Sequence, residues 1–196
     1  SSFFFFLNVG RVSNQNIHGL DFHDMIIVTH PDFLSYANQL AQFHENNDNL
    51  SVAVVTNQQV YNEFSSGTPD VSAIRNMMKM FYDKASNYDE MPKYLLLFGD
   101  GSFDNKSSSS DNTNYILTYQ SSNSLRPTAS FVTDDFFGLL DDNDGGSSGL
   151  VDIGIGRIPV KSATEAQNAV DKIIHYYDNV TFGDWRNILC FIGDDE

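Results

Sequence analysis

The sequence predicts an α/β domain with a small three-layer architecture, in which helices cover both faces of a parallel sheet. Several five-residue apolar runs are continuous rather than alternating, as in strands that are buried on both faces. Amphipathic helical stretches separate these runs, which gives the order β-α-β-α-β. The run at residues 94–98 ends in Gly99-Asp-Gly101. Glycines permit a sharp turn at the carboxyl edge of a sheet, where ligands usually bind in such folds.

The first part of the chain leads into the sheet. Residues 1–23 contain an aromatic strand at 3–9 and a polar loop, and we interpret them as a strap or the end of a preceding β-rich region. Residues 25–29 predict a buried strand. Asp32 is a suitable N-cap for a helix that begins at Phe33 and has apolar residues at helical spacing.

The next elements complete the core of the predicted sheet. Residues 50–56 are rich in valine and predict the second strand, followed by an irregular loop at 58–67. A second helix begins after Asp70, a good N-cap residue, and continues to about residue 85. The central strand at 94–98 follows, and residues 115–119 predict a short extended segment.

The last elements suggest a domain boundary. Residues 151–159 predict a strand in which small glycines let neighbouring backbone pack closely. Ser162 and Glu165 form a capping-box pattern at the start of a third helix that ends near Asn179. Residues 188–192 predict a new buried strand. We therefore expect one α/β subdomain at 24–183 and the beginning of another at 184–196.

Composition and charge exclude several classes of function. The chain has 196 residues and a net charge of −15, so it lacks the clustered Lys and Arg that nucleic acid or anionic lipid would require. The acidic excess is compatible with hard cations or basic peptides. No apolar run reaches the ~18–20 residues of a membrane helix, so we expect no membrane insertion. There is no initiator Met or charged leader, and we expect Ser1 to mark a cut within a longer protein.

Other chemical motifs favour structural roles. Gly154-x-Gly156 does not continue as a dinucleotide fingerprint, because the third glycine would fall at Pro159. Cys190 is the only cysteine, so an internal disulfide is excluded. Its position within an apolar run predicts a buried, inert thiol. The histidines have no paired metal-binding spacing and are expected to fill surface or core positions: His18, His23, His30, His44 and His175.

A glycine-flanked acidic turn is a candidate cation site. Asp141, Asp142 and Asp144 crowd carboxylates together, and binding of a hard cation through oxygen would relieve their repulsion. Asp100 at the end of the central strand could approach this loop across the edge of the sheet. Two Asp side chains with loop carbonyls would suit Ca²⁺. The alternative is a solvated acidic turn without a metal.

A set of segments distributed over the chain resembles gingipain-type cysteine peptidases (family C25). The similarity is greatest to the branch that serves as the sortase, or signal peptidase, of the type IX (Por) secretion system. The segments are residues 62–67, 73–75, 94–104, 133–135, 155–159 and 173–176. The resemblance implies that residues 24–183 form the Rossmann-like first subdomain of this family. It implies that residues 184–196 are the first strand of a truncated, caspase-like catalytic subdomain.

The resemblance also carries expectations about site residues. The family's nucleophile and base lie in Cys-containing and Gly-His-Gly segments, and neither motif occurs in this sequence. Alignment on Cys190 gives Asp195 as a possible orienting carboxylate for the catalytic His. The family binds structural calcium, and the matching positions here are Asp100 and Asp144, with carbonyls near Asp141 and Gly146.

The resemblance implies a function for the parent protein. It would be a cysteine endopeptidase or transpeptidase that is exported to the bacterial cell surface or outer membrane. There it would cleave C-terminal sorting signals of secreted proteins and contact other secretion-system proteins. This chain would be an inactive scaffold. A second hypothesis is a docking module from a degenerate peptidase, whose acidic edge binds a basic peptide or protein. A third is a calcium-dependent structural domain.

Overall fold

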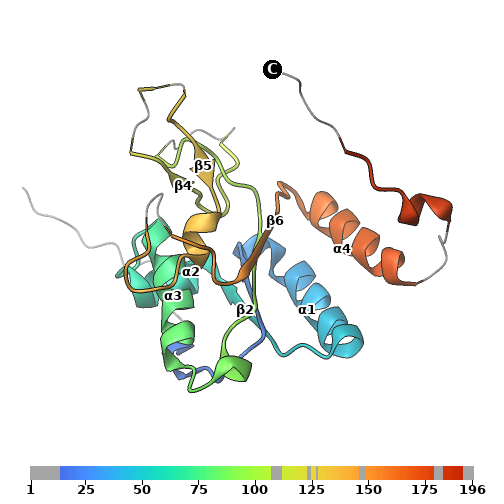
Figure 1. Cartoon of the computed structure of the whole chain (residues 1–196), viewed down its shortest axis with the longest axis horizontal. Helices are drawn as coiled ribbons and strands as arrows, with labels where there is room; N and C mark the ends of the chain where they lie inside the picture. The colour runs from blue at the N-terminus through green and yellow to red at the C-terminus, as the bar shows by residue number, and fades with distance from the viewer. Residues whose placement is uncertain are drawn as a thin grey trace, which may run out of the picture.

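The chain forms a four-stranded parallel sheet, which confirms the predicted α/β class (Figure 1). The computed structural model describes residues 14–106, 112–122, 125–126, 128–145, 149–178 and 183–191. The strands lie in the order β2-β1-β3-β6. Their bounds are β1 (Met25–Thr29), β2 (Val52–Thr56), β3 (Tyr94–Phe98) and β6 (Gly154–Ile158). The predicted strand at residues 3–9 lies outside the described residues.

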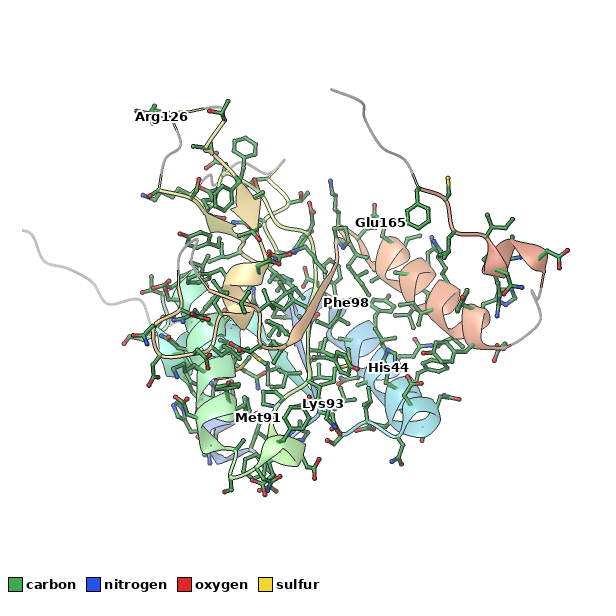
Figure 2. The ribbon with its side chains drawn as sticks, viewed as in Figure 1. His44, Met91, Lys93, Phe98, Arg126 and Glu165 are labelled. Atoms are coloured by element: carbon green, nitrogen blue, oxygen red, sulfur yellow. The ribbon has the colours of Figure 1, made fainter. Side chains whose placement is uncertain are left out.

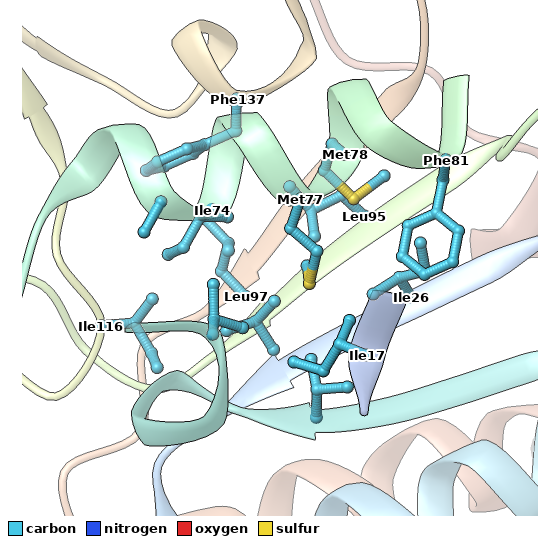
Figure 3. Packing of buried hydrophobic residues seen from close by; sticks show 14 of the residues in the cluster. Ile17, Ile26, Ile74, Met77, Met78, Phe81, Leu95, Leu97, Ile116 and Phe137 are labelled. Atoms are coloured by element: carbon cyan, nitrogen blue, oxygen red, sulfur yellow. The ribbon is translucent and has the colours of Figure 1, made fainter. Parts of the chain in front are cut away.

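Two helical layers enclose the sheet. One layer contains α1 (Leu34–Asp48) and α4 (Ala163–Tyr177), which lie side by side in Figure 1 and pack on Ile27 and Phe98. The other contains α2 (Asn57–Phe64), α3 (Val71–Lys84) and the 3-10 turn η4 (Asp135–Gly138). Figure 3 shows this second core, in which Met77 and Phe81 of α3 lie over Leu95 and Ile26. Successive strand residues thus point to opposite layers, and both layers are apolar.

Two of the predicted helix starts are confirmed and one is wrong. The Asp70 carboxylate accepts a hydrogen bond from Ser72 N at the start of α3, and Ser162 Oγ accepts one from Glu165 N at the start of α4. Asp32 does not cap α1. Its own backbone N–H donates to His30 Nδ1, and a 3-10 turn, η2 (Pro31–Phe33), precedes the helix. The imidazole at the strand end thus takes the capping role.

The predicted loop at residues 58–67 is wrong, because most of it is helix α2. Thr56 and Gln59 form a reciprocal capping box: Thr56 Oγ1 accepts from Gln59 N, and Gln59 Oε1 accepts from Thr56 N. The N-cap Thr56 is the last residue of β2, so the helix follows the strand without a loop. Polar residues at the helix start hide this boundary in the sequence.

The predicted strand at residues 188–192 is not formed in its described part. A 3-10 turn, η5 (Asp184–Asn187), precedes residues 188–191, which are in no regular structure. Leu189 and Phe191 are 84% and 91% exposed. Cys190 is exposed as well, so the prediction of a buried thiol is wrong. A strand requires a hydrogen-bonded neighbour, and none lies beside this segment within the described part of the chain.

The crossover from β3 to β6 is long and carries a small antiparallel ribbon. β4 (Tyr119–Gln120) pairs with β5 (Val132–Thr133) above the carboxyl edge of the main sheet (Figure 1). Only the last residue of the predicted extended segment at 115–119 is a strand. Two further 3-10 turns complete the described elements: η1 (Ile17–Gly19) and η3 (Tyr88–Glu90). No helix among the described residues is long and apolar enough to cross a membrane.

Candidate functional site at the carboxyl edge of the sheet

The turn after β3 brings two chain segments into close contact. Gly99 has a φ of 151°, which L side chains rarely adopt. A Cβ at Gly101 would lie 2.4 Å from Thr118 Cγ2 and 2.9 Å from Ile116 O. Tyr115 N and Ile116 N both donate to the Asp100 carbonyl, at 3.0 and 2.9 Å. The glycines therefore allow the returning chain to pack directly on this turn.

The Asp100 side chain holds the same loop. Thr113 Oγ1 donates a hydrogen bond to Asp100 Oδ2, and Lys161 Nζ lies 3.5 Å from that oxygen. The backbone N–H of Asp100 donates to Val160 O, just after β6. The Asp100 side chain is only 15% exposed. Its carboxylate is thus engaged by groups from two other segments.

Arg157 of β6 uses all of its donors at this edge. Nε and Nη2 make a bidentate pair with the Asp134 carboxylate, each at 2.7 Å. Nη1 donates to Gly99 O at 3.0 Å and Ile116 O at 2.9 Å, and Nη2 also donates to Leu117 O at 3.2 Å. A guanidinium has five N–H donors, and all five have acceptors here. Arg157 therefore connects β3, β6 and the long crossover.

Tyr115 fills the place where open α/β sheets usually bind ligands. That place is the switch point between β1 and β3, where strand order reverses. The Tyr115 ring lies there with its centroid 5.0 Å from that of His30 and 4.9 Å from that of Phe33. Asn57 Nδ2 donates to Tyr115 O at 2.8 Å, and Tyr115 OH donates to Lys161 O at 3.1 Å. Burial lowers the pKa of His30, and Asp32 opposes that shift.

The acidic loop packs on α3. Tyr82 OH donates to Asp141 Oδ1 at 3.1 Å, and Lys79 Nζ donates to Asp142 Oδ1 at 2.9 Å. The hydrogen bond from Lys79 lowers the pKa of Asp142. Arg75 Nη2 donates to the backbone carbonyl of Asp144 at 2.8 Å. Side chains of α3 thus neutralise part of this loop and hold its backbone.

Comparison with known proteins identifies the family. The family model of peptidase family C25 matches residues 20–196, most of the chain. The chain belongs to peptidase family C25. A crystal structure of dimeric latent PorU from Porphyromonas gingivalis is 39% identical to it over 91% of this chain, with a TM-score of 0.77. The chain spans 18% of that PorU chain. No curated protein matches the chain.

The described residues among the predicted calcium ligands of this C25 chain have protein partners. Asp100 contacts Thr113 and Lys161, whereas Asp141 contacts α3. Within the described ranges, no three His, Cys, Asp or Glu residues are grouped so that they could hold a metal ion. Gly146 and Asp195 lie outside the described residues. A calcium site formed by Asp100, Asp144 and loop carbonyls therefore stays a prediction, as does the alternative of an acidic turn without a metal.

Several important residues of the C25 chain were not singled out from the sequence. Arg157, Asp134 and Arg75 all lie within segments that carry the family resemblance, and each one fixes a loop. Tyr115 and Lys161 have no such signal, since their roles depend on contacts between distant segments. Cys190 is exposed and does not line the cavity that His175 and Trp185 line.

Proposed function

We propose that the parent protein is a cysteine peptidase that removes C-terminal sorting signals from secreted proteins at the bacterial cell surface. The observation that carries this proposal is the 39% identity with PorU over 91% of the chain, together with membership of peptidase family C25. PorU is the C-terminal signal peptidase of type IX secretion. Export and contact with other secretion-system proteins follow from that role.

This chain would supply a scaffold and no reacting group. The carboxyl edge of its sheet is closed by Tyr115, and the polar groups at that edge, Asp100 and Arg157, already have partners. In the proposed reaction, a His removes the proton of a Cys thiol, and the thiolate attacks the carbonyl of the scissile peptide bond. The bond to the sorting signal breaks, the His gives the proton to the departing amine, and water or another amine then releases the acyl group from the Cys. Both groups would come from segments of the parent protein beyond this chain. Asp195 remains our candidate for the carboxylate that orients the His.

The proposal is tested with a longer polypeptide that contains this chain and a following Gly-His-Gly and Cys segment. A secreted protein that carries a C-terminal sorting signal should be cut once, before the signal. Changing the downstream Cys to Ala should abolish cleavage, whereas Cys190→Ser should leave it unchanged. Equal cleavage of a substrate without the signal would contradict the proposal. If the longer polypeptide lacks those two motifs, the alternative of a non-catalytic docking module is favoured.

A further inference from the structure

The edge strand β6 leaves an open notch on the face of the sheet that α1 covers. Gly154 and Gly156 lie opposite Tyr94 and Leu96, and both glycines are exposed. A Cβ at Gly154 would lie 3.0 Å from Tyr94 Cδ1, so the Tyr94 side chain explains this glycine, rather than the close backbone packing that the sequence predicts. A Cβ at Gly156 would meet only Leu96 Cδ1, at 3.9 Å, and its φ is not in the left-handed region. Neither packing nor backbone geometry therefore requires glycine at position 156.

The notch is part of an apolar cavity of about 590 Å³. His44 Nδ1 lies 2.6 Å from Asp48 Oδ2 at its α1 wall, and His44 projects from α1 beside the sheet (Figure 2). A second cavity of about 710 Å³ shares His44 and Tyr177 and continues along α4 to Trp185. The apolar and aromatic residues that line the first cavity are Met25, Leu50, Tyr94, Leu95, Leu96, Ile155 and Tyr177.

The backbone edge beside this notch is unprotected. Natural proteins guard sheet edges with charged side chains, proline or bulges. The only charged residue in β6 is Arg157, and its guanidinium is bound to Asp134 at the opposite face. Pro159 follows the strand and guards none of its five residues. Among the described residues β6 is the last strand of the sheet, so its outer backbone groups are free to pair.

The segment that follows α4 does not suit this position. The connection from β1 through α1 leads to β2, away from β6, as a right-handed crossover. α4 lies on the same face of the sheet as α1. A right-handed crossover through α4 would therefore direct a parallel strand toward β3, where no place is free. A strand from another polypeptide segment therefore suits the free edge of β6 better than residues 188–191 do.

We propose that β6 accepts an extended peptide as an added strand, and that the peptide inserts one large apolar side chain into the notch over Gly156. Strand addition supplies backbone hydrogen bonds, and the cavity supplies side-chain selectivity. The net charge of −15 and the absence of Lys and Arg from the cavity lining favour peptides with basic flanking residues. The inference rests on the proposed peptidase function, since it describes a docking site for peptide substrates.

The test measures binding of a fluorescein-labelled peptide, Lys-Thr-Val-Phe-Val-Thr-Lys, to the 196-residue chain by fluorescence anisotropy. Gly156→Val should fill the notch and weaken binding at least tenfold while the Tm stays equal or rises. Gly156→Ala should weaken binding less than Gly156→Val. The alanine variant replaces the valine variant in the test if the valine variant does not fold. The matched control is Gln120→Val, an exposed position on β4, which should leave binding unchanged. Peptides with Ala in place of Phe, or Pro in place of the second Val, should bind poorly.

Three outcomes would overturn the inference. Gly156→Val could bind the peptide as tightly as the unchanged chain. The peptide could fail to bind while the chain forms a dimer that Gly156→Val abolishes, in which case a second copy covers the edge. The peptide could also fail to bind while a longer parent polypeptide still cleaves sorting signals, so that only the docking site is lost. Failure of the proposed function is a separate result, namely no cleavage by the longer polypeptide although the peptide binds.

Discussion

At the scale of single residues, the arginines in the segments that resemble family C25 bind mainly backbone carbonyl groups. Arg157 binds three carbonyl groups and one carboxylate, and Arg75 binds the carbonyls of Leu139 and Asp144. Glu63 of α2 has a similar role, because it accepts hydrogen bonds from Ile17 N and His18 N. These side chains fix loops that the sheet alone would not hold.

Replacing Arg157 by Lys should strongly destabilise the fold. A lysine cannot reproduce the bidentate pair with Asp134 or reach the three carbonyls, and the Arg157 side chain is only 13% exposed. We expect the free energy of unfolding to fall by about 3 kcal/mol in urea denaturation. Lys79→Met, which breaks a pair with the 90% exposed Asp142, should cost below about 1 kcal/mol and is the control. Equal costs for the two variants would contradict this role of Arg157.

Glu63 should make stability depend on pH in the acid range. Burial alone would raise its pKa, but hydrogen bonds from Ile17 N, Gln15 and His18 outweigh burial and lower the pKa to about 2 from an ordinary value of 4.5. A lowered carboxyl pKa gives stability that is fully present above pH 4.5 and is lost as pH falls toward 2. Its side chain is 14% exposed, and we expect it to contribute about 3 kcal/mol to the free energy of unfolding at pH 7.

The measurement is urea unfolding of the unchanged chain and of Glu63→Gln at pH 7 and at pH 3. The difference in unfolding free energy between the two proteins should shrink by about 2 kcal/mol at the lower pH. Glu45→Gln is the control, because Glu45 is exposed and should show no such change. A difference that stays constant between the two pH values would refute the assignment to Glu63.

At the scale of elements, apolar runs and caps predicted the four main strands and α1, α3 and α4. The sequence did not reveal α2, because its first residues are polar and its cap lies in the last residue of β2. The strand expected at residues 188–192 failed for the opposite reason, since its apolar pattern is clear but strand pairing depends on a neighbour.

In the candidate site, too, the sequence located a residue at a strand end but not its contacts with distant segments. Asp100 was correctly located at the strand end, but its partners Thr113 and Lys161 come from distant segments.

The capping box of α2 should be measurable by substitution. Thr56→Val keeps the branched shape of a side chain that is 8% exposed, but it removes the hydroxyl that accepts from Gln59 N. We expect a loss of about 1 kcal/mol in thermal unfolding. Gln59→Glu keeps an acceptor for Thr56 N and should change stability by less than about 0.5 kcal/mol. An equal loss in both variants would show that the capping box is not the stabilising feature.

At the scale of the whole molecule, topology suggests where the first subdomain ends. Because α4 shares a face of the sheet with α1, the chain that leaves α4 cannot add a right-handed parallel strand beside β6. Apolar side chains at residues 188–191 are exposed, and the start of a second unit at about residue 184 stays a prediction. The sheet, its two helical layers and the closed carboxyl edge then form a platform for that unit.

The most direct test of this platform account is a peptidase assay of the 196-residue chain itself, with and without alkylation of Cys190. The account predicts no hydrolysis of peptides or of a protein that carries a C-terminal sorting signal, before or after alkylation. Hydrolysis by the unmodified chain that is abolished by alkylating Cys190 would contradict it, because the chain would then contain its own nucleophile.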